Sequence, residues 1–251
     1  MPIWLQAGGW GLLAGSALVL GAAIGYYAHI PDRLIAGVMA FGSGVLISAL
    51  SFDFIEEAYN LGGFDATAIG FFAGAAIYTG ANYILSRQGA KHRKRSNELQ
   101  KEEKPEEGNG LALAIGALVD GIPESIVIGV GMIAGGSVSM VTVVAIFLSN
   151  LPEGLSSSAG MRKAGRSAKY VFGLWLGIAL ASSIAAILGY SLFSGFSPNV
   201  IAATTAVAAG AILAMLANTM ILEAFEKVHD FTGMIMVAGF MTAFILTKMG
   251  G

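Results

Sequence analysis

Long apolar stretches separated by short polar breaks run through the whole chain, and their lengths predict helices that cross a lipid bilayer. A membrane-spanning helix needs about 20 consecutive, mostly apolar residues. Six such stretches lie at residues 4–28, 33–57, 65–86, 109–134, 139–161 and 231–248. The region between Tyr170 and Leu222 contains no charged residue and is long enough for two more spans, which a Gly-Phe-Ser-Pro-Asn turn at residues 195–199 separates. The pattern therefore predicts eight transmembrane helices.

The composition agrees with a membrane protein. Hydrophobic residues make up 55% of the 251 residues and charged residues only 12%, whereas a soluble domain carries about 25% charged residues. The chain contains no cysteine, which excludes disulfides, thiolate metal sites and cysteine nucleophiles. The net charge is −2 with no basic excess, so nucleic acid is not expected as a partner. We therefore expect residues 1–251 to form a single all-α integral membrane domain.

The positions of the basic residues predict how the chain is oriented. If both termini lie outside the cytoplasm, thirteen of the fourteen Lys and Arg residues fall on the cytoplasmic side, and only Lys248 does not. Cytoplasmic loops of membrane proteins carry an excess of these residues. We therefore expect a multi-pass protein of the cell (inner) membrane with both termini extracytoplasmic. The charged loop at residues 87–108 is expected to be cytoplasmic and disordered.

Acidic residues occur inside the predicted spans, where a carboxylate is costly unless it is paired, hydrated or bound to a metal. Asp53 lies late in the second span, Asp120 and Glu124 in the fourth, Glu153 in the fifth and Glu223 late in the seventh. No Lys or Arg lies in the membrane core to pair with them. An isolated carboxyl is ambiguous, because it can be protonated and hydrogen-bonded. A group of carboxylates at one depth indicates a functional site.

The fourth and fifth spans each carry a Pro-Glu pair preceded by polar residues. The two segments read Asp-Gly-Ile-Pro-Glu-Ser at residues 120–125 and Ser-Asn-Leu-Pro-Glu-Gly at residues 149–154. Asp120 and Glu124 are spaced i, i+4 and so share one face of a helix. In an antiparallel hairpin of these two spans, Glu124 and Glu153 sit opposite each other near the middle of the membrane.

Together the two segments predict a cation site. Each proline leaves the carbonyl four residues earlier, that of Val119 or Leu148, without its helical hydrogen bond. Carboxylate, amide and carbonyl oxygens at one depth are suitable ligands for divalent cations. The candidate metal ligands are Asp120, Glu124, Asn150 and Glu153. Further candidates for a transport pathway are Ser149, Asp53, Glu57 and Glu223.

These motifs resemble those of the ZIP (Zrt/Irt-like) family of divalent-metal transporters, and the resemblance covers nearly the whole chain. Asp120-Gly-Ile-Pro-Glu124 is similar to the family's His-Asn-x-Pro-Glu, and Asn150-Leu-Pro-Glu153 to its fifth-span motif. The remaining similar segments are Ala36-Gly-Val-Met-Ala and Phe54-Ile-Glu-Glu57 in the second span, and Ala209-Gly-Ala with Glu223 in the seventh. The resemblance implies a 3+2+3 arrangement, in which the first and last three spans are inverted repeats around the central hairpin. It also implies a binuclear metal site in that hairpin and movement of metal toward the cytoplasm, and a homodimer is one compatible assembly.

The chain departs from the family pattern at several ligand positions. Asp120 stands where the family has histidine, Gly121 where it has asparagine, and Asn150 where its fifth span has an acid. The glutamate of its sixth span corresponds to Ser182. Oxygen ligands of this kind suit manganese or ferrous iron, whereas zinc favours nitrogen and sulfur but also binds carboxylates.

We therefore expect transport of a divalent metal cation (zinc, manganese or ferrous iron) toward the cytoplasm, with the metal as substrate and no cofactor. An enzyme is not expected. An intramembrane metallohydrolase would need histidine ligands and a general base, and the chain has no His-Glu-x-x-His motif and no histidine in a predicted span. Two alternatives remain open: a secondary carrier of another solute whose carboxylates handle protons, and a transport-inactive metal sensor. The expected partners are the metal ion and the lipid bilayer.

Overall fold

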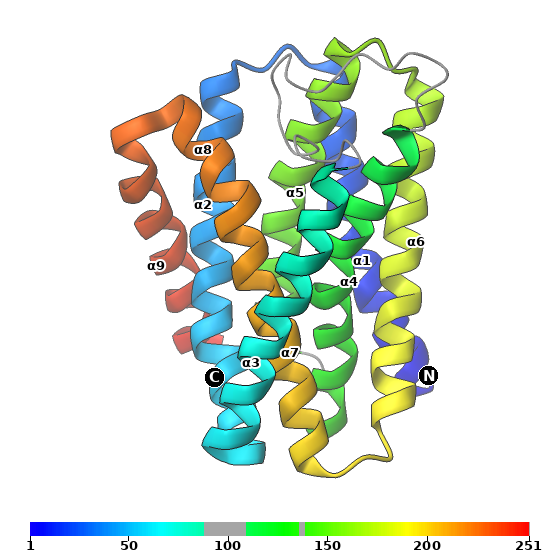
Figure 1. Cartoon of the computed structure of the whole chain (residues 1–251), viewed down its shortest axis with the longest axis vertical. Helices are drawn as coiled ribbons and strands as arrows, with labels where there is room; N and C mark the ends of the chain where they lie inside the picture. Colours follow the sequence, from blue (N-terminus) through cyan, green and yellow to red (C-terminus); the bar gives the residue numbers. More distant parts are fainter. Residues whose placement is uncertain (88–108, 136–138, 251) are drawn as a thin grey trace.

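The computed structural model describes residues 1–87, 109–135 and 139–250, and every element in these ranges is helical (Figure 1). The prediction of an all-α protein is therefore confirmed for the described part of the chain. The charged loop predicted at residues 87–108 lies, from residue 88 onward, outside the described residues. Both ends of the chain lie toward the same end of the helix bundle, the lower end in Figure 1.

Within each described range, short connections join the helices. In chain order they are α1 (Ile3–Tyr27), α2 (Asp32–Ala49), η1 (Leu50–Phe54), α3 (Ile55–Arg87), α4 (Asn109–Gly135), α5 (Met140–Lys163), α6 (Ala168–Phe193), α7 (Pro198–Met215), η3 (Leu216–Met220), α8 (Ile221–Val228), η4 (His229–Phe231) and α9 (Thr232–Gly250). The elements η1 and η3 are π-helical, and η4 is a 3-10 turn. Serine side chains cap two helices: Ser139 accepts from the backbone N–H of Thr142 in α5, and Ser167 from that of Tyr170 in α6.

Six helical segments in the described ranges are long and apolar enough to cross a membrane. Four of them are single helices, in α1, α4, α5 and α6. The other two, Asp32–Arg87 with 56 residues and Pro198–Met249 with 52 residues, are far longer than one crossing of a bilayer requires. The chain is therefore a membrane-embedded helical protein, as the hydrophobic pattern predicts.

Each of the two long segments reverses direction at a residue with a positive φ (Figure 1). The first turns at Gly63 inside α3, where φ is 70° and ψ is −172°. The second turns at His229, between α8 and α9, where φ is 49°. Glycine adopts such angles readily and other residues rarely. The break that the sequence predicts between residues 57 and 65 is thus confined to one glycine, because α3 is helical on both sides of it.

The helices pack in two groups. In the first, α1 packs chiefly on α5 and α6, and α4 packs on α6. In the second, α3 packs on α7 and α2 packs on α9. Contacts of α2 with α5, and of α4 with α7, join the groups. We refer to them as the α1/α4/α5/α6 group and the α2/α3/α7/α9 group.

Glycines bring α3 and α7 into direct backbone contact. A Cβ atom on Gly74 of α3 would overlap the carbonyl oxygen of Val207, and one on Gly210 of α7 would overlap the carbonyl oxygen of Phe71. Small residues at such positions let membrane helices approach closely and gain van der Waals contact, because lipid offers no hydrophobic driving force for their association. The α3–α7 interface is therefore one that larger side chains would force apart.

The interface between α2 and α9 repeats this arrangement. A Cβ atom on Gly44 would overlap the carbonyl oxygen of Met236, and one on Gly239 would overlap that of Phe41. Gly44 and Phe41 of α2 lie 166 positions before Gly210 and Val207 of α7. Gly239 and Met236 of α9 lie 165 positions after Gly74 and Phe71 of α3. The two contacts are therefore equivalent in sequence as well as in geometry.

A second pair of interfaces shows the same kind of correspondence. In each, two glycines approach carbonyl oxygens of the partner helix. Between α1 and α5, Gly21 approaches the carbonyl of Leu151, and Gly154 approaches that of Leu18. Between α6 and α4, Gly189 approaches the carbonyl of Ile126, and Gly129 approaches that of Ala186. The residues of α1 and α6 in these contacts are 168 positions apart, and those of α5 and α4 are 25 positions apart. The correspondence therefore extends through both helix groups.

The two π-helical segments obey the same spacing. Leu50–Phe54 ends the long α2 helix and Leu216–Met220 ends α7, and their positions differ by 166 residues. π-Helical turns are rare and often occur at functional sites. Each is followed three residues later by a glutamate, Glu57 after η1 and Glu223 after η3. The sequence pattern did not predict either π segment.

The glycine contacts predict a test of stability. Replacing Gly74 by alanine should lower the thermal unfolding midpoint in detergent, because the new Cβ would push α3 away from the carbonyl of Val207. Overpacking of this kind typically costs about 1–3 kcal/mol. Gly80→Ala in the same helix is the matched control, because a Cβ there has no atom within 4 Å. Equal midpoints for the two variants would contradict the close backbone contact.

Candidate cation site

The polar residues of the two Pro-Glu segments lie in the interior of the protein. Their exposed fractions are 1% for Asp120, 2% for Glu124, 1% for Ser149, 4% for Asn150 and 4% for Glu153. Helices α4 and α5 continue through Pro123 and Pro152, so neither proline ends its helix. Both helices therefore direct their polar faces inward, where they do not meet lipid.

Asp120 accepts a hydrogen bond from a residue that the sequence did not single out. The hydroxyl of Tyr78 in α3 lies 2.7 Å from Oδ1 of Asp120, and both side chains are buried. A buried carboxyl needs such partners, because water cannot reach it. Tyr78 belongs to the α2/α3/α7/α9 group and Asp120 to the α1/α4/α5/α6 group, so the hydrogen bond connects the two.

The glycine that follows Asp120 faces helix α6. The nearest side-chain atom to a Cβ built on Gly121 is the hydroxyl oxygen of Ser182, at 3.9 Å. Ser182, which the resemblance described above matches to a glutamate of the ZIP pattern, is buried. Two of the departures from that pattern therefore adjoin each other. One turn further along α4, the hydroxyl of Ser125 donates to the carbonyl of Gly121 at 2.8 Å.

On α5, two of the polar side chains donate to backbone carbonyls. The amide nitrogen of Asn150 donates to the carbonyl of Ala14 in α1 at 3.1 Å, and the hydroxyl of Ser149 donates to the carbonyl of Ile146 at 2.9 Å. With its nitrogen bound to α1, Asn150 can offer a cation only its amide oxygen. The hydrogen bond also fixes which side of α5 faces α1.

The proline of α5 lies against a glycine of α2. A Cβ on Gly42 would lie 3.1 Å from the ring of Pro152 and 3.4 Å from the carbonyl oxygen of Leu148. That carbonyl is the one that Pro152 deprives of its helical hydrogen bond. The irregular turn of α5 is thus held between α1, through Asn150, and α2, through Gly42.

The predicted hairpin of α4 and α5 is not a closely packed pair. The two helices run antiparallel, but they have little direct contact, since α4 packs mainly on α6 and α5 mainly on α1 (Figure 1). Within the described ranges, no group of three or more His, Asp or Glu side chains lies close enough together to hold a metal ion. The candidate ligands therefore share the interior without forming one compact carboxylate cluster.

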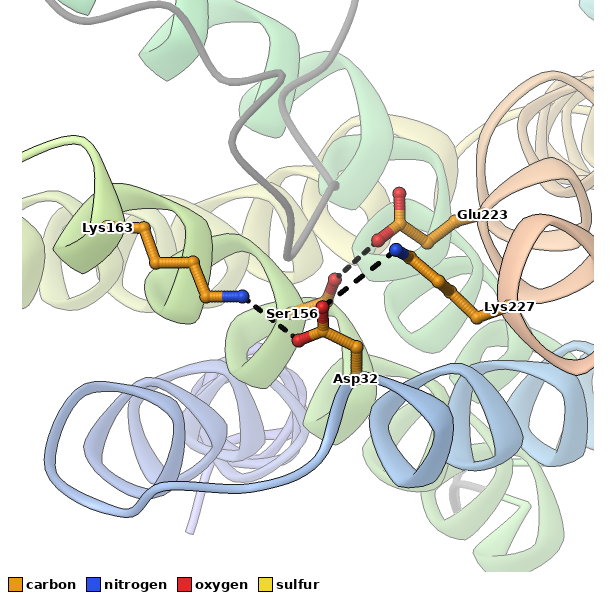
Figure 2. A network of polar contacts seen from close by, with 5 residues as sticks. All are labelled: Asp32, Ser156, Lys163, Glu223 and Lys227. Atoms are coloured by element: carbon orange, nitrogen blue, oxygen red, sulfur yellow. Dashed lines mark hydrogen bonds and ion pairs between the residues drawn. The ribbon is translucent and has the colours of Figure 1, made fainter.

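Glu223 lies next to the polar side of α5. The hydroxyl of Ser156 donates to its Oε1 at 3.2 Å, and both residues are buried (Figure 2). Ser156 follows Glu153 by three residues, about one turn of the helix. Buried polar side chains therefore continue along α5 from Glu153 toward its C-terminal end. The sequence placed Glu223 on a pathway but did not predict its partner.

Basic residues from different helices meet at this end of the bundle. Oδ1 of Asp32, the first residue of α2, lies 3.0 Å from the ammonium of Lys163, and its Oδ2 lies 3.9 Å from that of Lys227 (Figure 2). Arg162 donates to the carbonyl of Tyr26 at 2.7 Å. A cavity of about 380 Å³, whose lining includes Asp32, Arg162 and Lys163, opens at the same place.

Asp53 and Glu57 do not join the central group. They are only half-buried and belong to η1 and the start of α3, at the opposite end of the bundle from α8 (Figure 1). Lys248, the basic residue that the sequence placed apart from all the others, lies over the rings of Phe52 and Phe244 at 5.9 Å. Of the four pathway candidates, Ser149 belongs to the polar side of α5 and Glu223 lies beside it. Asp53 and Glu57 lie away from it.

Comparison with models of known protein families and with curated proteins found no match. The functional argument therefore depends on the residues and their geometry.

The hydrogen bond from Asn150 to α1 predicts that aspartate at this position lowers the stability of the protein. Asn150→Asp replaces the amide donor with a carboxylate that faces the carbonyl of Ala14. Losing this hydrogen bond in the interior should destabilise the protein by about 1–3 kcal/mol. The thermal midpoint in detergent without divalent cations should fall relative to the wild type. Asn60→Asp, at an exposed position, is the control and should change it little. An unchanged midpoint for the Asn150 variant would show that the hydrogen bond contributes nothing.

Proposed function

We propose that this protein is a ZIP-like transporter that moves a divalent metal cation across a membrane toward the cytoplasm, through a site formed by α4 and α5. The proposal rests on the burial of three carboxylates and one amide, those of Asp120, Glu124, Glu153 and Asn150, on two helices that each contain a Pro-Glu pair. Burying acids in a membrane protein is costly and is typical of ion pathways. A passing divalent cation would offset two of these three negative charges.

The proposal includes eight membrane crossings. The reversals at Gly63 and His229 support this count, because each divides a segment of more than 50 residues into two helices of spanning length. The spans would be α1, α2 with η1 and the first turns of α3, the rest of α3, α4, α5, α6, α7 with η3 and α8, and α9. An even number of crossings agrees with the two chain ends lying at the same end of the bundle.

The proposed arrangement is 3+2+3, with the first and last three spans as inverted repeats. Four observations support it: the matched glycine contacts of α3–α7 and α2–α9, those of α1–α5 and α6–α4, the two π segments, and the glutamates that follow them. Repeats of this kind relate two halves of a transporter by a pseudo-twofold axis in the membrane plane, and substrate sites lie where they meet. In this chain the helices at that place are α4 and α5.

The proposed orientation puts the end with Asp32, Lys163 and Lys227 in the cytoplasm, in keeping with the positive-inside rule. A cation would approach from the end where Asp53 and Glu57 lie and bind between α4 and α5. It would leave past Ser156 and Glu223. Because α4 and α5 have little direct contact, a cation that binds side chains of both would draw the two helices together.

The ligand atoms favour particular cations. All the proposed ligands offer oxygen, and no histidine lies in a proposed span. Such a set suits manganese or ferrous iron, and zinc also binds carboxylates. The ion is the substrate, so its binding must be reversible. The amide of Asn150, in place of a fourth carboxylate, would weaken the hold of the site on the ion.

The central glutamates should be essential for transport. Glu124→Gln and Glu153→Gln keep the side-chain size but remove the negative charge that a divalent cation needs, so each should abolish uptake of Mn²⁺ and Zn²⁺ into reconstituted vesicles. Glu226→Gln, an exposed acid on α8, is the matched control and should transport normally. Near-normal uptake by either central variant would remove that residue from the site. Uptake of another solute, with no metal uptake by the wild type, would favour the secondary-carrier alternative.

The orientation can be tested with single cysteines, because the chain contains none. Ala168→Cys begins α6 at the proposed cytoplasmic end, and Ser197→Cys precedes α7 at the opposite end. A membrane-impermeant thiol reagent should label the Ser197 variant in intact cells and the Ala168 variant only after the cells are opened. The reverse pattern would invert the proposed direction, and equal labelling of both in intact cells would contradict the eight-span topology.

A further inference from the structure

We propose that a cavity at the reversal between α8 and α9 binds the phosphate of an anionic phospholipid through Arg33, Lys227 and His229. The cavity has a volume of about 320 Å³, and its lining consists of Arg33 of α2 and residues 227–231. We refer to it as the reversal cavity. The inference is independent of metal transport, because it needs only that these helices are embedded in a membrane.

The reversal cavity lies at the level of the lipid headgroups. Residues 229–231 join α8 to α9, which runs back in the opposite direction (Figure 1). A turn of this kind lies at the membrane surface, because its irregular backbone cannot be exposed to hydrocarbon. The apolar side chains of Phe231, of Met234 and of Leu34 beside Arg33 are exposed. A lipid whose phosphate occupies the cavity would lay its acyl chains over them.

The charges of the lining favour an anion over a cation. Arg33 and Lys227 bring two positive charges, and Asp230 brings one negative charge. The two basic side chains would repel a metal ion. A phosphodiester carries a single negative charge, which complements the net charge of the lining. Arginine and lysine are also well suited to phosphate, because their hydrogen bonds to it are assisted by charge.

Both basic groups are able to donate to a phosphate. The ammonium of Lys227 lies 3.9 Å from Oδ2 of Asp32, which is too far for a hydrogen bond (Figure 2). Lys163 holds the same carboxyl more closely, at 3.0 Å through Oδ1. Arg33 is exposed, and no hydrogen bond or ion pair joins it to another residue that the structure describes. Neither group would have to give up a hydrogen bond to bind a lipid.

The backbone of His229 gives a second and independent reason to place a ligand here. Its φ of 49° and ψ of −120° form a conformation that glycine adopts readily and other residues avoid. Strained residues of this kind cluster at ligand-binding sites. A glycine would make the same turn without strain, so the imidazole has a role that the turn does not require. Because His229 lines the cavity with Arg33 and Lys227, we assign it a further hydrogen bond to the phosphate.

Asp230 narrows the class of lipid. A carboxylate in the lining disfavours a headgroup with a second negative charge, such as a phosphate monoester. The same carboxylate accepts hydrogen bonds from hydroxyl groups. The lining therefore fits a phosphodiester whose headgroup carries hydroxyls, as in phosphatidylglycerol. Phosphatidylcholine has the same phosphate, but its quaternary ammonium cancels the net charge and donates no hydrogen bond.

The test measures the affinity of the full chain, in neutral detergent at about 0.15 M salt, for phosphatidylglycerol. The readout is the rise of the thermal unfolding midpoint with lipid concentration. Arg33→Gln and Lys227→Gln should each weaken the apparent affinity about tenfold, as expected for a lost charge-assisted hydrogen bond. Lys169→Gln is the matched control, because it removes an exposed basic side chain at the same end of the bundle. It should change the affinity by less than about twofold, since salt screens distant charges.

His229→Gly separates a role in lipid binding from a role in folding. Without lipid, its thermal midpoint should be at least as high as that of the wild type, because glycine relieves the strain at this turn. Its affinity for phosphatidylglycerol should nevertheless fall, by about fivefold for one lost hydrogen bond. Wild-type affinity in this variant would remove His229 from the site, whatever its midpoint.

Three further results would overturn the proposal. Equal stabilisation by phosphatidylglycerol and by phosphatidylcholine with the same acyl chains would show that the cavity does not recognise the charge of the lipid. An equal loss of affinity in the Lys169→Gln control would reduce the effect to general attraction by a basic surface. Full displacement of the lipid by inorganic phosphate at the same concentration would assign the cavity to a free anion.

Discussion

The close approach of helix backbones through glycine is the constraint on which the rest of this structure depends. In lipid, apolar side chains gain little by leaving the solvent, so helices associate through van der Waals contact and interhelical hydrogen bonds. Glycines at the α3–α7, α2–α9, α1–α5 and α4–α6 interfaces place backbone against backbone. These contacts fix the relative rotation of the helices, and the rotation decides which side chains face inward. The burial of Glu124 and Glu153 follows from it, because each has a glycine of its own helix in such a contact nearby, Gly129 and Gly154.

The same packing explains how so many polar groups are accommodated in the interior. Asn150 donates to a carbonyl of α1, Ser156 to Glu223, and Tyr78 to Asp120. In each case the partner lies on a different helix, and the short interhelical distances let modest side chains reach it. A buried polar group without such a partner costs about 1–3 kcal/mol. Polar side chains thus add hydrogen bonds between helices that glycines have already brought together.

Much of the fold could be predicted from the sequence, because a bilayer demands apolar stretches of a set length and the charges fall between them. The helix bounds of α1, α5 and α6 agree with the predicted spans within a few residues, as does the break before Pro198. The Pro-Glu segments could be found as well, because acids in an apolar stretch stand out. The partners Tyr78 and Ser156 could not, since each looks like an ordinary core or packing residue, and only the fold brings it to an acid far away in sequence. The π segments also left no mark in the hydrophobic pattern, because they add one residue to a turn without changing its polarity.

The matched contacts also show where the two halves of the chain differ, and this difference bears on the direction of transport in the proposed mechanism. The offset of 25 positions that relates α4 to α5 in the glycine contacts pairs Glu124 with Ser149, and Glu153 with Ile128. Each central glutamate thus has a residue without charge as its counterpart, although the scaffold around them is matched. Outside the centre, Glu57 and Glu223 are equivalent to each other and lie toward opposite ends, but Glu223 is buried against Ser156 whereas Glu57 is half-buried. In the proposed mechanism, the repeated scaffold would provide two similar routes to the middle of the membrane. The unequal placement of the acids would make these routes chemically different, so a cation would meet different ligands on arrival and on departure.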